Sequence, residues 1–212
     1  MKMAKRLSIL VLTLILLVAM AVPVCAEEVS SSSGGAEQAV ITSNKGVYTK
    51  KTITLKYKSE NADSYVIKYR TKGGKWKTVE TTDSSYVLKC KENGLYEVKI
   101  AGVKDGKTGA FSKVSYRFMA QAKPKAAAGK KSIKVTAPKT KNATGYMIQY
   151  STDKSFKKGA KTIRVNSSAA LNKTIKNLKK GKTYYVRVRP ICKKGGKTYL
   201  GVYRRTKAVK VK

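Results

Sequence analysis

One pattern of alternating apolar and polar residues occurs twice in this 212-residue chain, and it limits the possible folds more than any other feature. The run 53–57 (Ile-Thr-Leu-Lys-Tyr) matches 133–137 (Ile-Lys-Val-Thr-Ala), and 65–69 (Tyr-Val-Ile-Lys-Tyr) matches 146–150 (Tyr-Met-Ile-Gln-Tyr). Two further matches join 96–100 to 184–188 and 106–108 to 196–198. Because the copies lie 80–90 residues apart, each is the size of a domain rather than of a solenoid unit.

The alternation itself predicts β-strands, since apolar residues at every second position bury one face of a strand. In the run 184–188 the tyrosine and the valines at alternate positions are expected to face a core, whereas Arg187 and Arg189 are expected to face water. Gly-containing turn sequences separate the runs, at 72–75, 104–107 and 193–196. The pattern therefore predicts an all-β chain with two immunoglobulin-like sandwich domains in tandem.

The first 26 residues have the organisation of a secretory signal peptide. Basic residues within 2–6 precede an almost wholly apolar stretch at 7–22, and Val24-Cys25-Ala26 offers suitable residues for cleavage before Glu27. The alternative is an uncleaved membrane anchor, because the apolar stretch approaches the length of a membrane span. After cleavage we expect no segment that could cross a membrane, and the product is predicted to be extracellular.

The rest of the chain divides by composition. Residues 27–39 are rich in Ser, Gly and Glu and are predicted to form a flexible linker. The first domain is expected at 40–120 and the second at 121–212, with the boundary near Pro124.

Two motifs of the second copy resemble the fibronectin type III domains found in tandem in secreted proteins of Gram-positive bacteria. Residues 142–150 (Asn-Ala-Thr-Gly-Tyr-Met-Ile-Gln-Tyr) resemble the third strand of that family, and 178–189 resemble its tyrosine corner and sixth strand. The resemblance implies that Leu178 packs in a core and that the Tyr184 hydroxyl bonds to nearby backbone. The corresponding positions of the first copy hold Cys90 and Tyr96.

The chain departs from that family at its usual core tryptophan on the second strand. Tyr57 stands there in the first copy and Ala137 in the second, while Trp76 lies elsewhere. Because alanine removes much apolar volume, the second core is expected to be repacked or less stable.

The composition argues against catalysis and against a bound metal or cofactor. The chain has no His, which removes the usual general base and the commonest metal ligand. The 11 Asp and Glu residues are scattered, without the spacing of a calcium-binding loop. Asp153 is the one acid after residue 120, so no carboxylate pair can form within the second copy. We therefore predict a non-enzymatic protein that uses no cofactor.

Two cysteines remain after the signal segment, Cys90 and Cys192. Both stand at positions that the strand pattern assigns to a core, which favours reduced thiols acting as small apolar side chains. Export would permit a disulfide between them, so that alternative stays open.

Positive charge is the one strong feature beyond the fold. Residues 40–120 carry 17 basic and 7 acidic residues, whereas residues 121–212 carry 27 basic and 1 acidic residue, a net charge of +26. A domain with such a charge attracts polyanions by releasing their counterions. The candidate polyanion-binding residues are Lys157, Lys158, Lys179, Lys180, Lys182, Lys193, Lys194, Lys197, Arg204 and Arg205.

The predicted partners follow from this charge and from export. Anionic cell-wall polymers or other polyanions are expected to hold the protein at the envelope. Lys outnumbers Arg by 39 to 8, which favours nonspecific adhesion by hydrated point charges and argues against specific nucleic-acid recognition. The alternative partner is an extracellular protein or glycan, with the protein as an adhesion-type module whose charge is incidental.

Overall fold

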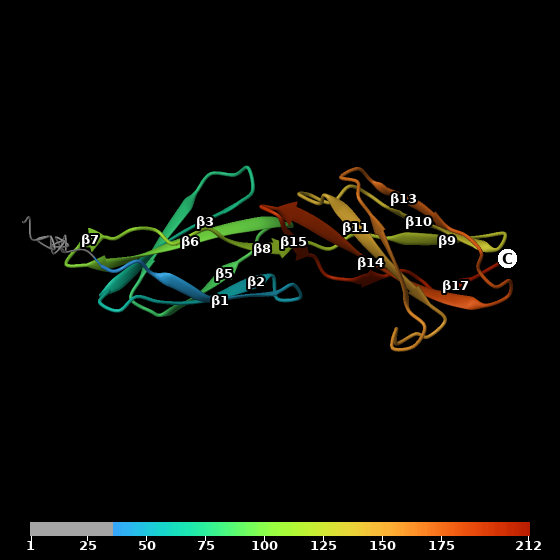
Figure 1. The fold of residues 1–212 in the computed structure, drawn as a ribbon, viewed down its shortest axis with the longest axis horizontal. Coiled ribbons are helices and arrows are strands. Elements are labelled where there is room, and N and C mark those ends of the chain that lie inside the picture. Colours follow the sequence, from blue (N-terminus) through green and yellow to red (C-terminus); the bar gives the residue numbers. More distant parts are fainter. Residues whose placement is uncertain (1–35) are drawn as a thin grey trace, which may run out of the picture. The chain divides into compact units, whose positions relative to one another are not determined.

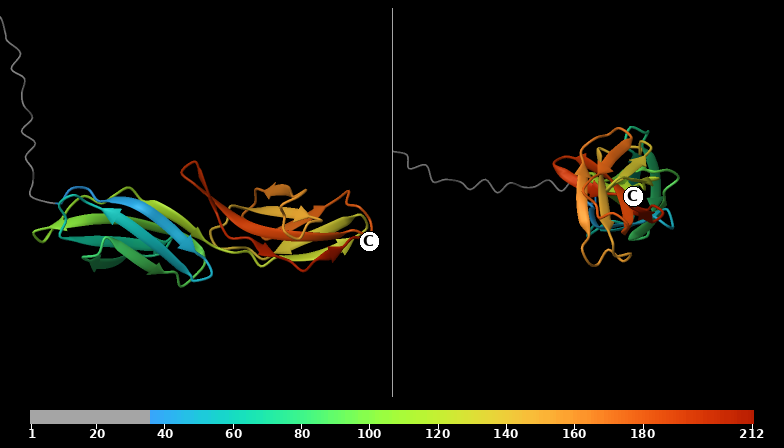
Figure 2. Two further views of the ribbon diagram at one scale, coloured as in Figure 1. Left: turned by 90° about the horizontal axis from the view of Figure 1, so that it is seen from below. Right: turned by 90° about the vertical axis from the view of Figure 1, so that its right-hand side faces the viewer.

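The computed structural model describes residues 36–212, which form strands and turns with no helix (Figure 1). Four antiparallel sheets pair into two sandwiches, and Figure 2 shows each sandwich as layers of strands. The predicted all-β fold with two immunoglobulin-like, fibronectin type III-like sandwiches is therefore confirmed. The predicted signal peptide at 1–26 and nearly all of the linker at 27–39 lie outside the described residues.

The first sandwich packs a three-stranded sheet against a larger one. The smaller sheet has the order β1-β2-β5, with β1 at Val40–Val47, β2 at Thr52–Lys58 and β5 at Ser85–Lys89. The larger sheet has the order β4-β3-β6-β7, with β8 also paired to β6. Its strands are β3 (Ser64–Thr71), β4 (Lys77–Thr81), β6 (Gly94–Lys104), β7 (Lys107–Thr108) and β8 (Ser115–Met119). Alternate residues of β2 are buried, as the sequence pattern predicts.

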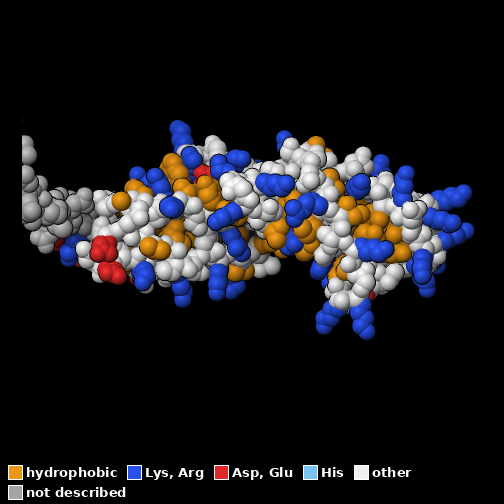
Figure 3. Space-filling view, viewed as in Figure 1, with side chains coloured by type: hydrophobic (Ala, Val, Ile, Leu, Met, Phe, Trp, Pro, Cys, Tyr) orange, Lys and Arg blue, Asp and Glu red, His pale blue; other side chains and the backbone are white. Residues whose placement is uncertain are grey.

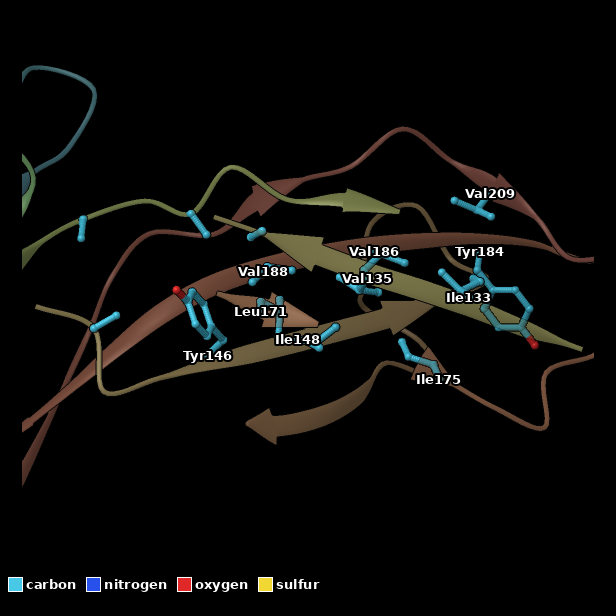
Figure 4. Close-up of a cluster of buried hydrophobic side chains, with 14 of the residues drawn as sticks. Ile133, Val135, Tyr146, Ile148, Leu171, Ile175, Tyr184, Val186, Val188 and Val209 are labelled. Carbon is cyan, nitrogen blue, oxygen red and sulfur yellow. The ribbon is translucent and has the colours of Figure 1, made fainter. Parts of the chain in front are cut away.

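The second sandwich repeats this arrangement. The smaller sheet has the order β13-β10-β9, with β9 at Lys125–Gly129, β10 at Ser132–Ala137 and β13 at Leu171–Ile175. The larger sheet has the order β12-β11-β14-β15, and β16 and β17 also pair with β14. Its strands are β11 (Gly145–Ser151), β12 (Lys161–Val165), β14 (Thr183–Lys194), β15 (Lys197–Leu200), β16 (Arg204–Arg205) and β17 (Val209–Lys210). Ile133, Val135, Ile148, Val186 and Val188 meet between the sheets (Figure 4).

The two cores differ where the family resemblance places a tryptophan. Tyr57 packs edge-on against Tyr65 with ring centroids 4.7 Å apart, and its buried hydroxyl has no hydrogen-bond partner within residues 36–212. In the second core Ala137 takes the position of Tyr57, and fully buried Tyr146 takes that of Tyr65. The Tyr146 hydroxyl accepts a hydrogen bond from the Thr140 N–H at 3.0 Å. The lower stability expected of the Ala137 core stays a prediction.

The two buried tyrosines make a matched pair of variants. Tyr57→Phe is expected to raise the free energy of unfolding by about 1 kcal/mol, because it removes a buried hydroxyl that no group of residues 36–212 satisfies. Tyr146→Phe is expected to lower it by about 1 kcal/mol, because it leaves the buried Thr140 N–H without an acceptor. Urea denaturation followed by circular dichroism measures both changes. Equal destabilisation by the two variants would contradict the assignment.

Candidate anion-binding surface

A buried tyrosine fixes the basic turn that precedes β14. The Tyr184 hydroxyl accepts a hydrogen bond from the Lys179 N–H at 3.3 Å, and Leu178 is buried beside it in the core. The side chains of Lys179, Lys180 and Lys182 remain exposed. The turn is thus held by its backbone, which leaves its three ammonium groups free to contact a ligand.

The first sandwich contains the corresponding corner. The Tyr96 hydroxyl donates a hydrogen bond to the Glu92 carbonyl oxygen at 3.0 Å, and Cys90 is buried at the position of Leu178. The turn before Tyr96 reads Lys-Glu-Asn-Gly at 91–94, so it carries mixed charge. The tyrosine corner therefore holds a turn with only basic charges in the second sandwich, and a turn of mixed charge in the first.

Three separate segments bring lysines to one end of the second sandwich. The Leu178 N–H donates to the Lys131 carbonyl oxygen at 3.0 Å, and the Lys131 N–H donates to the Lys212 carbonyl oxygen at 2.9 Å. Gly181 likewise bonds to Val211 at 2.9 Å. Figure 3 shows Lys and Arg side chains concentrated at this end, near β17. The basic end consists of Lys130, Lys131, Lys179, Lys180, Lys182, Lys210 and Lys212, all exposed.

An open pocket of about 470 Å³ lies beside the basic end. Tyr150 and Tyr184 line it, with ring centroids 6.4 Å apart. Its lysines are Lys161, Lys176, Lys179 and Lys182, and no Asp or Glu lines it. A hollow with cationic walls and an aromatic lining suits an anionic, hydroxylated group better than an apolar one.

Asp153 shapes the loop between β11 and β12. Its carboxylate accepts hydrogen bonds from the Ser155 hydroxyl and from the backbone N–H groups of Ser155, Lys157 and Lys158. The Ser155 hydroxyl bond, followed by the backbone bonds, holds the Asp153 pKa far below its ordinary value of 3.8. The one acid of the second sandwich therefore fixes a loop, and it leaves the Lys157 and Lys158 side chains exposed.

The remaining predicted residues lie apart from the basic end. Lys193, Lys194 and Lys197 lie at the β14–β15 hairpin, whereas the basic turn lies at the start of β14. Because β14 is 12 residues long, its ends are more than about 30 Å apart at ~3.4 Å per residue. Arg204 and Arg205 pair with the middle of β14. The structure thus distributes the ten predicted residues over several separate patches.

Cys90 and Cys192, the two cysteines of residues 36–212, are buried, free thiols. Burial raises the pKa of Cys90 to about 11 and also raises the pKa of the Cys192 thiol. Because the thiolate is the reactive form, these pKa shifts suppress nucleophilic chemistry at neutral pH. The cysteines therefore act as small apolar side chains, and the disulfide alternative is not seen.

Arg187 and Arg189 do not face water as the alternation predicts. Both are half-buried, because aromatic side chains from outside the strand pattern cover this side of the sheet. The Arg187 guanidinium carbon lies 4.3 Å from the ring centroid of Phe156, and the Arg189 carbon lies 4.4 Å from that of Tyr203. Guanidinium groups are planar and weakly hydrated, so they pack well on rings. Strand periodicity shows which side of a sheet a residue faces, but it does not show what covers that side.

The described residues contain little else that could carry chemistry. Residues 36–212 hold no group of three or more His, Cys, Asp or Glu placed to bind a metal ion. In the same part of the chain, no helix has the length and apolar character needed to cross a membrane. Ion pairs there join Arg70 to Glu97, Lys104 to Asp63 and Lys141 to Glu92. The positive charge of the second sandwich is therefore almost wholly uncompensated.

Comparison with known proteins finds similarity to solved structures. No family model matches the sequence, and no curated protein matches it. Among solved structures, the chain is similar to the crystal structure of chicken CNTN1 FN1-FN3 domains. The identity is 17% over 84% of this chain and 68% of that chain, with a TM-score of 0.36. A similarity this distant supports no functional argument, so the fold assignment rests on the strand pairing of this chain.

The role of Asp153 can be tested through the pH dependence of stability. A carboxylate whose folded pKa is lowered stabilises the fold above its unfolded pKa, and that stabilisation is lost as the pH falls. We expect Asp153→Asn to lower the melting temperature at pH 7, and the difference from wild type to shrink below pH 3.8. Circular dichroism melts at pH 7 and pH 2 measure this. Glu80→Gln, which removes an exposed carboxylate of the first sandwich, is the control. A difference in melting temperature between Asp153→Asn and wild type that stays constant with pH would contradict the role of the Asp153 carboxylate in fixing the loop.

Proposed function

We propose that the chain is an exported, non-enzymatic binding or spacer module of a Gram-positive bacterial envelope. Electrostatic attraction to anionic polymers retains it there. The observation that carries the proposal is the basic end, where seven exposed lysines from three segments meet with no Asp or Glu among them. The fibronectin type III-like fold supports a binding role, and the buried thiols and the lack of His support a role without catalysis.

The mechanism is counterion release from a polyanion. Each lysine that approaches a phosphate or carboxylate displaces condensed cations, so binding weakens steeply as salt rises. The exposed lysines need no fixed geometry, because an ammonium group acts as a point charge on a flexible stem. This suits attachment to a polymer with many equivalent anionic groups, such as a teichoic acid.

A second candidate function is adhesion to a protein through the first sandwich. Three large apolar side chains of its smaller sheet are exposed: Val40 by 54%, Val47 by 43% and Val87 by 52%. Contacts with such side chains are driven by burial of apolar surface and survive high salt. Salt dependence therefore separates the two functions.

Cosedimentation with purified cell walls tests the proposal directly. Protein spanning residues 27–212 is mixed with walls that keep or lack teichoic acid, from about 50 mM to 1 M salt. Binding that needs the polymer and collapses with salt is expected from the electrostatic mechanism. Binding that ignores the polymer and survives salt would favour the adhesion module, and absence of binding would reject envelope retention.

A charge-reversal variant tests the basic end itself. Lys179→Glu, Lys180→Glu and Lys182→Glu together are expected to weaken wall binding by at least about tenfold at intermediate salt, because repulsion replaces several phosphate contacts. The fold is expected to survive, since these side chains are exposed and the turn is held by backbone bonds. The same reversal at Lys72, Lys75 and Lys77 of the first sandwich is the matched control. Equal losses in the two variants would show that only net charge matters.

A further inference from the structure

Each larger sheet carries a cation between two aromatic rings on its outer face. In the first sandwich the Lys99 ammonium lies 5.2 Å from the Trp76 ring centroid and 4.6 Å from that of Phe111. In the second, the Arg187 guanidinium lies 4.3 Å from Phe156 and 4.4 Å from Tyr203. Lys99 and Arg187 hold corresponding positions in β6 and β14, one residue after matched core valines. The outer faces of the two larger sheets therefore share one arrangement, a cation between two aromatic rings. The matched sequence runs do not show it, because the four ring residues lie outside those runs.

The two faces differ in net charge. In the first sandwich Glu97 is buried, and one of its carboxylate oxygens lies 2.6 Å from the Arg70 guanidinium nitrogen Nε. This carboxylate neutralises one of the cations on that face. Tyr185 occupies the corresponding position of β14, so the second sandwich lacks the internal counter-charge.

Arginines are concentrated on the uncompensated face. The strand register places Arg164 and Arg189 on either side of Met147, and it pairs Arg187 with Arg205. We call these four residues the arginine face: Arg164, Arg187, Arg189 and Arg205. Within residues 36–212 none of the four forms an ion pair with a carboxylate.

Contacts beneath the arginine face orient three of its four guanidinium groups, those of Arg187, Arg189 and Arg205. The Arg187 Nε–H donates to the Gln149 Oε1 atom at 2.8 Å, and the Arg189 Nε and Nη2 atoms lie 3.3 Å and 3.1 Å from the Met147 sulfur. The Arg205 guanidinium lies 5.3 Å from the ring centroid of Phe156, a residue presented by the loop that Asp153 fixes. Stacking and hydrogen bonds hold these guanidinium groups in place before a ligand arrives, which lowers the entropy cost of binding.

We propose that the arginine face binds the phosphate groups of a phosphodiester polymer through paired guanidinium–oxygen hydrogen bonds. The inference rests on the proposed envelope function and deepens it: the lysines attract any polyanion, and the arginine face adds paired hydrogen bonds to its phosphate oxygens. A guanidinium offers a planar fork of donors that matches two oxygens of one phosphate, which an ammonium cannot do. A sheet spaces such groups regularly, about 4.8 Å between strands and ~6.8 Å along one strand, which suits a ligand with repeated anionic groups.

The aromatic rings argue against a nucleic acid as the occupant. Proteins that bind single-stranded nucleic acids stack bases on exposed aromatic faces. Here Phe156 is only 8% exposed, and Arg187 and Arg189 of β14 cover the ring of Tyr203. Phe156 and Tyr203 thus give the arginine face little free ring surface on which bases could stack, which favours a simple polyol phosphate chain.

The test replaces guanidinium by ammonium and leaves the charge unchanged. Wild type and the variant R164K/R187K/R189K/R205K are titrated with poly(glycerol phosphate) and with polygalacturonate, a carboxylate polymer, at one fixed salt concentration. The variant is expected to lose about tenfold in affinity for the phosphate polymer, because an ammonium cannot make the paired hydrogen bonds of a guanidinium. A guanidinium fork also fits the two oxygens of a carboxylate, so an equal loss with polygalacturonate would overturn phosphate as the assigned ligand.

Two controls keep the result interpretable. R70K/R117K makes the same exchange in the first sandwich and is expected to leave both affinities unchanged. R164K/R205K replaces only the two exposed members of the face and keeps Arg187 and Arg189 stacked on their rings. It replaces the fourfold variant in the test if that variant melts early, and it is expected to lose about threefold in affinity for the phosphate polymer. Circular dichroism melts show whether each variant is folded.

The outcomes separate this inference from the proposed function. If folded variants bind the phosphate polymer as tightly as wild type does, the arginine face is rejected while electrostatic retention stands. If wild type binds neither polymer even at low salt, both proposals fail. Tighter binding to single-stranded DNA or to anionic lipid vesicles than to poly(glycerol phosphate) would overturn the assigned ligand.

Discussion

The hydrogen-bonded pairing of β14 positions both the core residues and the outward arginines of the second sandwich. This 12-residue strand pairs with β11 along one edge and with β15, β16 and β17 along the other. Its inward residues, among them Val186 and Val188, close the core, while Arg187 and Arg189 are carried on the opposite side. A one-residue slip in register would exchange these two sets, so the core and the arginine face are specified by the same backbone bonds.

A net charge of +26 over residues 121–212 opposes compaction, and the structure limits that cost by where it places each kind of cation. Most lysines lie exposed at turns and strand ends, and Lys134 and Lys173, which lie within strands, are exposed as well. Arginines lie on the sheet, where aromatic rings and neutral acceptors stabilise the guanidinium groups of Arg187, Arg189 and Arg205. The one acid, Asp153, is used to fix the loop that brings Phe156 over the sheet.

The two kinds of cation suit different tasks. The lysines of the basic end give long-range attraction that depends on charge and salt alone. The arginine face offers short-range, directional hydrogen bonds on a rigid sheet. In the first sandwich the Arg70–Glu97 pair shows what such a face becomes when a carboxylate is built into it. The duplicated fold therefore presents the same kind of surface twice, once with an internal carboxylate that neutralises one cation and once without it.

Alternation and repetition in the sequence determined the fold class, the duplicated strands and the core positions, because a strand with one buried face needs an apolar residue at every second position. The turn lysines were also readable, because Gly-rich turns between strands lie at the surface. Only the tertiary structure decided that Lys131, Lys179 and Lys212 share one end, and that Phe156 and Tyr203 cover Arg187. Those contacts join segments far apart in the chain, and local periodicity carries no information about which loops meet.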